Sequence, residues 1–431
     1  MNIILINPPY FGIEDDHLEQ NLGIAYIASY LIHHGFHNTD ILELTGISDL
    51  NECLKKIPYA DAYGISCYTT SYDNVRFIIS FIKNKINPEA YIFVGGPHPT
   101  ALPKQTFVDS GANLVITGEG ENAALIAMQS LKDGNPIKGV VHGKGIANLD
   151  SLPYPIRLIS KDNPFTRVYQ GERMVSMVAT RGCPFSCLHC NSNIMGAGSK
   201  GIRSRSVENI ISEIRYLKQL GYRCFRFNDD NFLAHSNIVE LLDEISKEKI
   251  KFRIFGHVEY LTDYICRLLK LAGCEFVSVG IESLNPDNLK FLHKYSNIMF
   301  LHNLQNAQRY GLVIRASFMV GLPFDTDDTI KLYFSEAVKL YIQEFAVYPL
   351  IPYPGTEIAI NAEKLHYKIV NNDYNNYMQM GVDGEACYSL SYNNPETGNS
   401  FGPEDVKRWK QKAEELLSTT MIHMRNSVQA K

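Results

Sequence analysis

The sequence predicts an α/β protein that begins with a doubly wound parallel sheet, continues with a partial (β/α)6 barrel and ends in a mainly helical segment. Short apolar runs alternate with helix-length amphipathic segments in residues 1–137 and again in residues 166–360, as in parallel sheets with crossover helices. Residues 138–165 lack this periodicity and contain prolines, as a linker does. Because the second block has six strand–helix units, fewer than a closed eight-unit barrel, we expect it to stay open, followed by a C-terminal segment of residues 361–431.

The first block is expected to contain five strands and five helices. The strands are short apolar runs rich in β-branched and aromatic residues: Ile3–Ile6, Asp40–Leu44, Ala62–Ser66, Tyr91–Val94 and Leu114–Thr117. The helices lie between or after them, near Leu22–His34, Asp49–Ile57, Tyr72–Ile86, Lys104–Ser110 and Glu121–Leu131.

Glycine and polar residues mark the loops that follow these strands. The loops are Asn7–Tyr10, Cys67–Ser71, Gly95–Thr100 and Gly118–Glu121. A dinucleotide site would need a Gly-x-Gly-x-x-Gly turn after the first strand, where Pro8 and Pro9 stand instead. Each glycine alone is explained by a turn, but ligands bind at the carboxyl ends of such strands, and four such loops at one edge favour a ligand site.

The second block repeats the alternation with longer spacings. Its expected strands are Val175–Ala179, Cys224–Phe227, Phe252–Gly256, Phe276–Gly280, Val313–Val320 and Phe345–Pro349. Its expected helices include Val207–Leu220, Ser236–Lys247, Thr262–Leu271, Ile298–Tyr310 and Thr326–Leu340.

The amino-acid composition limits the kinds of partner that this chain is expected to bind. With 45% hydrophobic and 20% charged residues, the chain has the balance of a packed globular protein. A net charge of −5 provides no basic surface for a nucleic acid. The apolar stretch Leu22–Ile32 is too short to span a bilayer, and the start has no basic segment before its apolar run, so we expect a cytoplasmic protein without a signal peptide or membrane span.

The C-terminal segment divides into a polar stretch, Tyr367–Asn399, and a helix. The run Gly402-Pro403-Glu404-Asp405 starts the helix, because proline and acidic residues suit a first turn. Residues at helical spacing then predict a packing face: Val406, Trp409, Ala413, Leu416, Leu417, Thr420 and Met424. The polar stretch either caps the barrel mouth or is an ordinary surface loop.

Three of the nine cysteines, Cys183, Cys187 and Cys190, share one loop after the first strand of the second block. Three thiolates repel one another unless a metal neutralises them, and thiolates are the ligands of iron–sulfur centres. A structural zinc would need a fourth ligand, for which His189 is unsuited because the adjacent Cys190 already binds. We therefore expect a cluster with one open iron; zinc or an unligated group of cysteines are the alternatives. The other cysteines are expected to be packing residues: Cys53, Cys67, Cys224, Cys266, Cys274 and Cys387.

The Cys-x3-Cys-x2-Cys spacing at the end of a first barrel strand resembles the signature of radical S-adenosylmethionine (SAM) enzymes, which use a six-unit barrel. The resemblance implies a 4Fe–4S cluster on Cys183, Cys187 and Cys190, whose open iron chelates the amino and carboxylate groups of SAM. Reduction of the sulfonium would then yield a 5′-deoxyadenosyl radical. An electron donor such as flavodoxin or ferredoxin is the implied partner.

Further matches to this family follow the later strands. Asn228–Phe232 resembles the acidic motif that receives the methionine amino group, and Gly280–Ser283 resembles the stretch that contacts ribose and carboxylate. Gly321–Pro323 and Tyr353–Glu357 complete the resemblance. The implied SAM contacts are His189 beside the adenine, Asp229, Asp230, Glu282, Ser283 and Arg315. The alternatives are an unliganded loop residue for His189, a helix cap for one of the aspartates and a structural ion pair for Arg315.

The first block resembles the Rossmann-like cobalamin-binding domain that precedes the barrel in one large subfamily, on Leu22–Tyr26, Gly95–His98 and Gly118–Glu121. The implied cobalamin contacts are Pro9, Tyr10, Leu22, Gly23, Tyr68, Thr69, Thr70, Ser71, Gly95, Gly96, Pro97, His98, Gly118, Glu119 and Gly120. By resemblance, the Tyr68–Ser71 loop faces the lower side of the corrin ring, and the two later loops enclose the nucleotide tail. No Asp-x-His-x-x-Gly motif is present, so His98 is not assigned to cobalt.

The resemblance implies an enzyme that acts on a small-molecule or peptidic substrate. In one hypothesis, the radical abstracts hydrogen from an unactivated carbon and cobalamin delivers a methyl group. In the other, the first domain is empty or carries electrons, and the radical drives a cyclisation, rearrangement or oxidation. Methylthio transfer to RNA would need a second cysteine triplet, whereas the first block has Cys53 and Cys67 alone. A non-catalytic iron–sulfur scaffold would have no use for acidic residues at successive strand ends.

Overall fold

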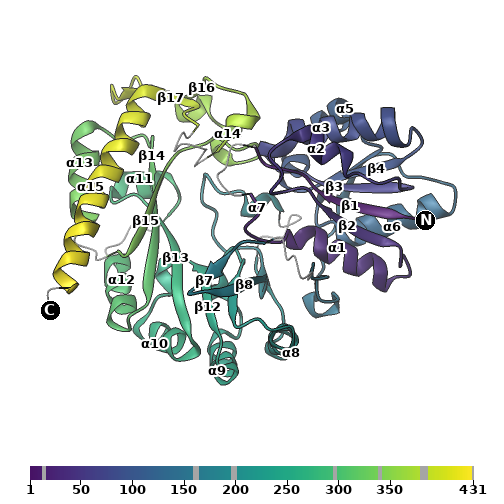
Figure 1. Cartoon of the computed structure of the whole chain (residues 1–431). Helices are drawn as coiled ribbons and strands as arrows, with labels where there is room; N and C mark the ends of the chain where they lie inside the picture. Colours follow the sequence, from purple (N-terminus) through teal and green to yellow (C-terminus); the bar gives the residue numbers. More distant parts are fainter. Residues whose placement is uncertain are drawn as a thin grey trace.

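The computed structural model describes residues 1–11, 16–158, 165–195, 201–294, 299–337, 342–378 and 387–429. The chain forms a parallel-sheet domain, on the right of Figure 1, and a curved second sheet with outer helices, on the left. The C-terminal helix lies at the far side of the second domain from the first. The predicted α/β class, with a doubly wound domain before an open barrel, is confirmed.

All strand pairs of the first sheet are parallel, in the order β2-β1-β3-β4-β5-β6. The strands are β1 (Ile3–Asn7), β2 (Thr39–Glu43), β3 (Ala62–Ser66), β4 (Tyr91–Gly95), β5 (Leu114–Gly118) and β6 (Gly139–Gly143). The chain passes from β1 to β2 on one side and then crosses back to β3 on the other side of β1. Such a reversal of strand order opens a crevice at the carboxyl edge of the sheet.

Helices cover both faces of this sheet, which explains why β1 and β5 are buried along their whole length. They are α1 (Leu22–His33), α2 (Leu50–Lys55), η1 (Thr69–Ser71), α3 (Tyr72–Phe81) continued by η2 (Ile82–Ile86), α4 (Pro97–Ala101), α5 (Pro103–Ser110) and α6 (Glu121–Lys132), followed by η3 (Leu149–Ser151). Two apolar clusters, one on each face, form the core of the domain.

Two elements of this domain differ from the sequence expectation. Strand β6 lies inside residues 138–165, where a linker was expected, so the sheet extends beyond residue 137. This strand is at the sheet edge and buries little besides Gly143, so it has no apolar run that periodicity could reveal. Helix α4 (Pro97–Ala101) overlaps the expected loop Gly95–Thr100, because Pro97 suits a first helical turn.

The second sheet has the order β15-β14-β13-β12-β11-β8-β7, with six parallel strands and the antiparallel edge strand β7. The strands are β7 (Val168–Tyr169), β8 (Glu172–Met177), β11 (Cys224–Phe227), β12 (Lys251–Gly256), β13 (Cys274–Glu282), β14 (Val313–Val320) and β15 (Glu344–Pro349). Among the described residues β15 pairs with β14 alone, so the barrel is open. A separate pair, β9 (Thr180–Arg181) and β10 (Arg203–Ser204), lies beside it.

The helices of the barrel lie on the outer side of the curved sheet (Figure 1). They are α8 (Val207–Gln219), α9 (Ile238–Glu248), α10 (Asp263–Ala272), α11 (Pro286–Phe291), α12 (Met299–Arg309) and α13 (Asp327–Ala337). The domain also contains the short elements α7 (Ser192–Met195), η4 (Phe232–Ala234), η5 (Val258–Tyr260) and α14 (Glu357–Ile360). Residue 298 and residues 338–340, which belong to two of the expected helices, lie outside the described residues.

The C-terminal segment adds a small antiparallel sheet to the expected helix. It contains η7 (Glu363–Leu365), β16 (Tyr367–Ile369), η8 (Tyr374–Asn376), β17 (Leu390–Asn393), β18 (Ser400–Phe401) and α15 (Pro403–Gln429). Helix α15 runs beside α13 (Figure 1), where Arg408 and Trp409 donate hydrogen bonds to Asp327. Within the polar stretch, Asn375 donates to Asp73 of α3 over 2.7 Å, so this stretch also contacts the first domain. No described helix combines the length and the apolarity that crossing a membrane requires.

Candidate active site between the two domains

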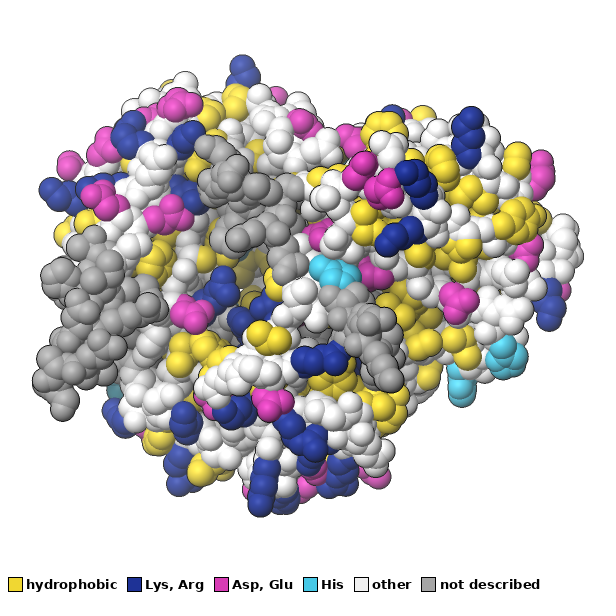
Figure 2. Space-filling view, in the orientation of Figure 1, with side chains coloured by type: hydrophobic (Ala, Val, Ile, Leu, Met, Phe, Trp, Pro, Cys, Tyr) yellow, Lys and Arg dark blue, Asp and Glu magenta, His cyan; other side chains and the backbone are white. Residues whose placement is uncertain are grey.

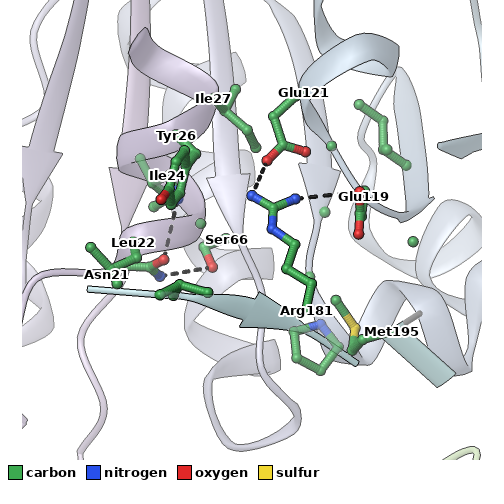
Figure 3. Close-up of a pocket in the computed structure, with 18 of the residues that line it drawn as sticks. Asn21, Leu22, Ile24, Tyr26, Ile27, Ser66, Glu119, Glu121, Arg181 and Met195 are labelled. Carbon is green, nitrogen blue, oxygen red and sulfur yellow. Dashed lines mark hydrogen bonds and ion pairs between the residues drawn. The ribbon is translucent and has the colours of Figure 1, made fainter. Parts of the chain in front are cut away.

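A cavity of about 370 Å³ lies between the carboxyl ends of the two sheets. Nine of the predicted cobalamin residues line it: Leu22, Gly23, Tyr68, Gly95, Gly96, Pro97, Gly118, Glu119 and Gly120. The opposite wall comes from the barrel and includes Thr180, Arg181, Gly182, Ser192, Met195, Arg203, Asn228 and Asp230. Figure 3 shows Arg181 and Met195 facing α1 and the Glu119–Glu121 loop across this space. The glycine loops of the first domain and Asp230 of the barrel therefore share one cavity. The other residues predicted for the cluster and SAM are not among its lining residues: Cys183, Cys187, Cys190, His189, Asp229, Glu282, Ser283 and Arg315.

The cavity extends under α1 along the first sheet. Leu5, Gly64 and Phe93, which stand in the middle of their strands, line its deep end together with Ile116. A Cβ on Gly64 would lie 2.3 Å from Phe93 Cζ, so no larger residue is tolerated there. The sequence did not single out these residues, because their apolar character matches any buried strand.

Polar side chains fix the mouth of the cavity at the point where the strand order reverses. Asn21, the N-cap of α1, donates to Asn7 Oδ1 over 3.0 Å and to Ser66 Oγ over 3.2 Å (Figure 3 shows the bond to Ser66). This amide therefore joins the ends of β1 and β3 to the start of α1. Beside it, Gly96 adopts φ +117°, and a Cβ there would approach Cys67 O to 2.7 Å.

Six of the predicted cobalamin contacts are absent from the cavity wall: Pro9, Tyr10, Thr69, Thr70, Ser71 and His98. Tyr10 packs edge-on against Tyr68, with ring centroids 5.7 Å apart. His98 is fully buried and stacks on Tyr72 at 4.1 Å, and Tyr374 of the C-terminal segment meets it edge-on. Burial lowers the pKa of His98 to about 4. These residues therefore pack behind the loops that line the cavity and do not face the cavity themselves.

A four-residue ion cluster joins the walls of the cavity. Arg181 Nη2 lies 2.6 Å from Glu121 Oε1, and Arg181 Nη1 lies 3.3 Å from Glu119 Oε2 (Figure 3). Arg203 also contacts Glu119, with 3.1 Å between Nη1 and Oε2. Burial alone would raise the pKa of Glu119, but Arg203 and Arg181 outweigh it and lower this pKa. Neither arginine was predicted as a site residue from the sequence, although Arg181 stands two residues before Cys183.

The cysteine loop is held against the barrel by backbone hydrogen bonds. Leu188 N donates to Leu292 O, and Leu188 O accepts from Ile358 N, each over 3.2 Å. At the start of the loop, Gly182 has φ +94°, and a Cβ there would lie 2.5 Å from Gly201 O. A glycine is therefore required directly before Cys183.

The three thiols lie within electrostatic range of one another. Burial, then the charge of Cys190 and Glu282, raises the pKa of Cys187 to about 11, although Lys294 opposes this. Burial and Cys190 also raise the pKa of Cys183. In the described part of the chain no three Cys, His, Asp or Glu side chains converge on a single point as a preformed metal site. Thiols so placed ionise together when a cation is present, and this donor set suits an iron–sulfur cluster.

The two aspartates after β11 have different surroundings. Asp229 is buried and accepts hydrogen bonds from Ala179 N and from Thr180 N and Oγ1. These bonds explain why β8 ends at Met177, two residues before the expected Ala179. Asp230 instead lines the cavity and accepts from Ser192 Oγ over 2.9 Å. Of these two aspartates, only Asp230 lines the cavity.

Three of the four remaining predicted SAM residues, His189, Glu282 and Ser283, lie around the end of β13. Glu282 Oε1 is 2.9 Å from Lys294 Nζ and 3.7 Å from His189 Nε2. Burial would raise the pKa of Glu282, but Lys294 and His189 outweigh it and lower this pKa to about 2. Ser283 Oγ accepts from Asn285 N over 3.1 Å. Arg315 lies apart from this group, in the middle of the barrel on β14.

Comparisons with known proteins match both domains. The radical SAM superfamily matches residues 177–336, and the B12 binding domain matches residues 13–127. An uncharacterized methyltransferase of Pyrococcus horikoshii is 28% identical over 376 residues, or 81% of this chain and 79% of that protein. Bacteriochlorophyllide d C-12(1)-methyltransferase of Chlorobaculum tepidum is 26% identical, over 62% of this chain and 58% of its own length.

Solved structures share the fold. The radical SAM methyltransferase TsrM of Kitasatospora setae, with cobalamin and a 4Fe-4S cluster bound, superposes with a TM-score of 0.71 at 15% identity, covering 96% of this chain and 89% of that chain. The chain therefore contains a radical SAM domain and shares the fold of TsrM. More particularly, its radical SAM domain follows an N-terminal B12 binding domain, and the two matched domains imply a 4Fe–4S cluster, SAM and cobalamin as cofactors.

Proposed function

We propose that the chain is a cobalamin-dependent radical SAM methyltransferase that methylates an unactivated carbon of a small-molecule or peptidic substrate. The observation that carries this proposal is the shared cavity, because Gly95 of the cobalamin-type loops and Asp230 and Gly182 of the barrel line the same space. Similarity to proteins named methyltransferases supports methylation as the outcome.

The residues of the barrel edge are suited to hold the cluster and SAM. Cys183, Cys187 and Cys190 supply three thiolates and leave one iron for SAM. Asp230 is the partner we assign to the methionine ammonium, since it faces the cavity, while Asp229 holds the backbone before the cysteine loop. Glu282 stays ionised beside Lys294 and can accept hydrogen bonds from ribose hydroxyls.

The first domain is suited to hold part of the cobalamin. Its cavity is apolar and narrow at Gly64, and the Gly95–Gly96 and Gly118–Gly120 loops bring backbone close to any occupant. The volume of this cavity is that of a site for a drug-sized ligand, so the cavity would hold the nucleotide tail rather than the whole cofactor. His98, neutral and stacked on Tyr72 behind the loop, has no role as a ligand in this proposal.

When bound, SAM on the cluster supplies one-electron cleavage chemistry and cobalamin supplies methyl transfer. The chain itself aligns the two edges through Glu119, Glu121, Arg181 and Arg203, which close the wall between them. Closure of that wall excludes water from a reactive site. Reduction of the cluster needs an electron donor, for which we propose a small flavodoxin or ferredoxin.

The test uses the full chain, reconstituted anaerobically with iron and sulfide and then supplied with cobalamin, SAM and dithionite. We expect corrin absorbance to remain with the protein after desalting, and both 5′-deoxyadenosine and S-adenosylhomocysteine to form. Failure to retain corrin would sink the methyltransferase proposal. Formation of 5′-deoxyadenosine without cobalamin-dependent S-adenosylhomocysteine would favour a cyclisation, rearrangement or oxidation instead, and absence of both products would favour a scaffold.

A further inference from the structure

Arginines occupy the inner face of three barrel strands. In β11, Phe225 and Phe227 belong to the core packed against the outer helices, so Arg226 between them faces the lumen. Arg226 is the register partner of both Ser176 on β8 and Arg253 on β12. Partners in a parallel pair project to the same face, so Arg226 and Arg253 stand side by side inside the barrel.

The third arginine continues this row across the lumen. Arg315 on β14 lies between Ile314 and Ala316, which belong to the outer core. Its register partners are Ser278 on β13 and Glu344 on β15. Arg253 Nη2 also reaches Ser278 Oγ, at 3.3 Å. The three guanidinium groups therefore share one polar wall.

Acidic groups balance this charge in part. Glu19, from the loop before α1, enters the barrel and contacts both Arg226 and Arg167. Glu344 is the other acid whose charge reaches Arg253. Four arginines and two glutamates leave an excess of two positive charges. Within the described residues, neither Arg253 nor Arg315 forms an ion pair within 4.0 Å, whereas Arg181 and Arg203 at the domain boundary are both paired.

Arg226 and Arg253 each keep one buried donor without a partner. The Nε atoms of Arg226 and Arg253 are both buried without a hydrogen bond. Phe255 packs under Arg226, at 4.9 Å, and Phe276 lies 5.9 Å from Arg253, so the rings cover guanidinium faces and leave the N–H edges open. Burial lowers the pKa of Arg226 to about 10, and burial together with Arg167 and Arg315 lowers the pKa of Arg253. Adjacent positive charges that are partly buried destabilise the folded protein, and a bound anion would offset this repulsion.

We propose that the barrel lumen binds an anionic group of the substrate, a carboxylate or a phosphate, with Arg253 and Arg315 as its direct partners. Calling this ligand the substrate rests on the proposed function, whereas the anion site itself does not. Planar guanidinium groups bind such anions through two parallel hydrogen bonds. The arginines stand three residues into their strands, whereas Asp230 and Glu282 stand at the carboxyl ends. An anion held there directs the rest of a small molecule toward the cysteine loop.

The face shown in Figure 2 is hollowed near its centre, and Lys and Arg side chains lie at that hollow beside hydrophobic ones. This arrangement fits a ligand with one charged end and an apolar body. Glu19 acts as a positioning residue in this proposal, because it holds Arg226 and Arg167 in place.

The experiment measures binding of inorganic phosphate to the full chain without cofactors, by thermal unfolding at constant ionic strength. The double variant Arg253→Gln/Arg315→Gln removes both charges, and Arg173→Gln, an exposed arginine of β8, is the matched control. We expect phosphate to raise the Tm of the wild type and of Arg173→Gln, with an apparent affinity about tenfold or more weaker in the double variant. General stabilisation by phosphate is equal in all three and cancels in the comparison.

An equal phosphate response in the wild type and the double variant would overturn the inference. If the double variant does not fold, Arg253→Lys and Arg315→Lys replace it, because lysine keeps the positive charge but cannot form the two parallel hydrogen bonds of a guanidinium group. We then expect phosphate affinities several-fold weaker than that of the wild type. Unchanged affinities would contradict the proposal. Corrin retention of the same proteins separates the two proposals. Retained corrin without a difference in phosphate binding removes the lumen site alone, whereas lost corrin in the wild type removes the methyltransferase proposal and leaves the phosphate result standing.

Discussion

The two parallel sheets of this chain present the same architectural edge with opposite chemistry. At the carboxyl edge of the first sheet, glycines and apolar side chains line a deep cavity, and the charges at its rim are paired. At the second sheet, three thiols, Asp230 and Glu282 follow the strands, and arginines line the lumen below. Parallel topology decides where a site lies, and the loops after the strands decide whether it binds by shape or by charge.

Burial has different consequences in the two regions. His98, in the first domain, has aromatic neighbours, and burial lowers its pKa to about 4, so it is neutral. Glu282, in the barrel, is also buried, but Lys294 and His189 lower its pKa to about 2, so it is charged. A buried titratable group is therefore neutral where its neighbours are uncharged and ionised where its neighbours carry the opposite charge.

We expect the largest effect from removing one cysteine of the triplet, compared with removing a cysteine that only packs in the core. Replacing Cys187 with alanine removes one of three thiolates, so we expect iron content after reconstitution to fall to about a tenth of wild type or less. Cys266→Ala is the matched control, since Cys266 is fully buried in the barrel core. Elemental iron analysis checks this. A full iron load in Cys187→Ala, or equal losses in both variants, would contradict the assignment.

A substitution at Gly95 tests whether the shape of the cavity in the first domain determines cobalamin binding. Gly95 lines the cavity, and a Cβ there would meet Ile116 at an ordinary 3.6 Å, so Gly95→Val fills the cavity without straining the backbone. We expect cobalamin affinity to fall about tenfold or more, measured by corrin absorbance after desalting at several cobalamin concentrations. Gly402→Val, at an open position, controls for the added side chain. Equal affinities of the two variants would place cobalamin elsewhere.

The ion cluster between the edges is expected to have a smaller effect. Arg203→Gln leaves Glu119 partly unpaired at a position 9% exposed, and the single changes should each cost about 1–3 kcal/mol. Because the partners are in contact, the double variant Glu119→Gln/Arg203→Gln should lose less than the sum, which denaturant midpoints measure. Arg408→Gln, at an exposed pair, should cost under about 1 kcal/mol. Additive losses at Glu119 and Arg203 would show that they do not interact.

The smallest expected effect concerns pH and His98. Its folded-state pKa of about 4 lies below the unfolded value of 6.5, so the unfolded chain binds the proton more strongly between these values. This contribution to stability is complete above pH 6.5 and is lost as the pH falls toward 4. Between pH 7 and pH 5 it amounts to about 2 kcal/mol.

Denaturant midpoints at pH 7 and pH 5 measure this dependence. The difference between the two midpoints should be smaller in His98→Gln than in the wild type and in His37→Gln, which changes an exposed histidine of the same domain. The same difference in all three proteins would mean that His98 is protonated in the folded chain at pH 5.

The sequence predicted the features that depend on local spacing and missed those that depend on distant pairs. The cysteine triplet, the glycine loops and Asp230 are contiguous motifs at strand ends; the glycine loops and Asp230 line one cavity, and the triplet directly follows Gly182, which also lines it. Glu19 and Arg226 are 207 residues apart, and nothing in either local sequence indicates that they meet. The depth of the cavity at Gly64 and the role of Asp229 as a backbone acceptor likewise follow from packing. The assignment of individual residues to SAM and cobalamin, and the domain bounds, stay predictions.

Metal analysis of one desalted sample tests the central claim, that a single chain carries both a cluster and cobalamin. The full chain is reconstituted anaerobically with iron, sulfide and cobalamin and passed through a desalting column, and iron and cobalt are then measured per chain. We predict about four iron atoms and about one cobalt atom per chain. Iron without cobalt would contradict the account of the first domain, and cobalt without iron would contradict the account of the cysteine loop.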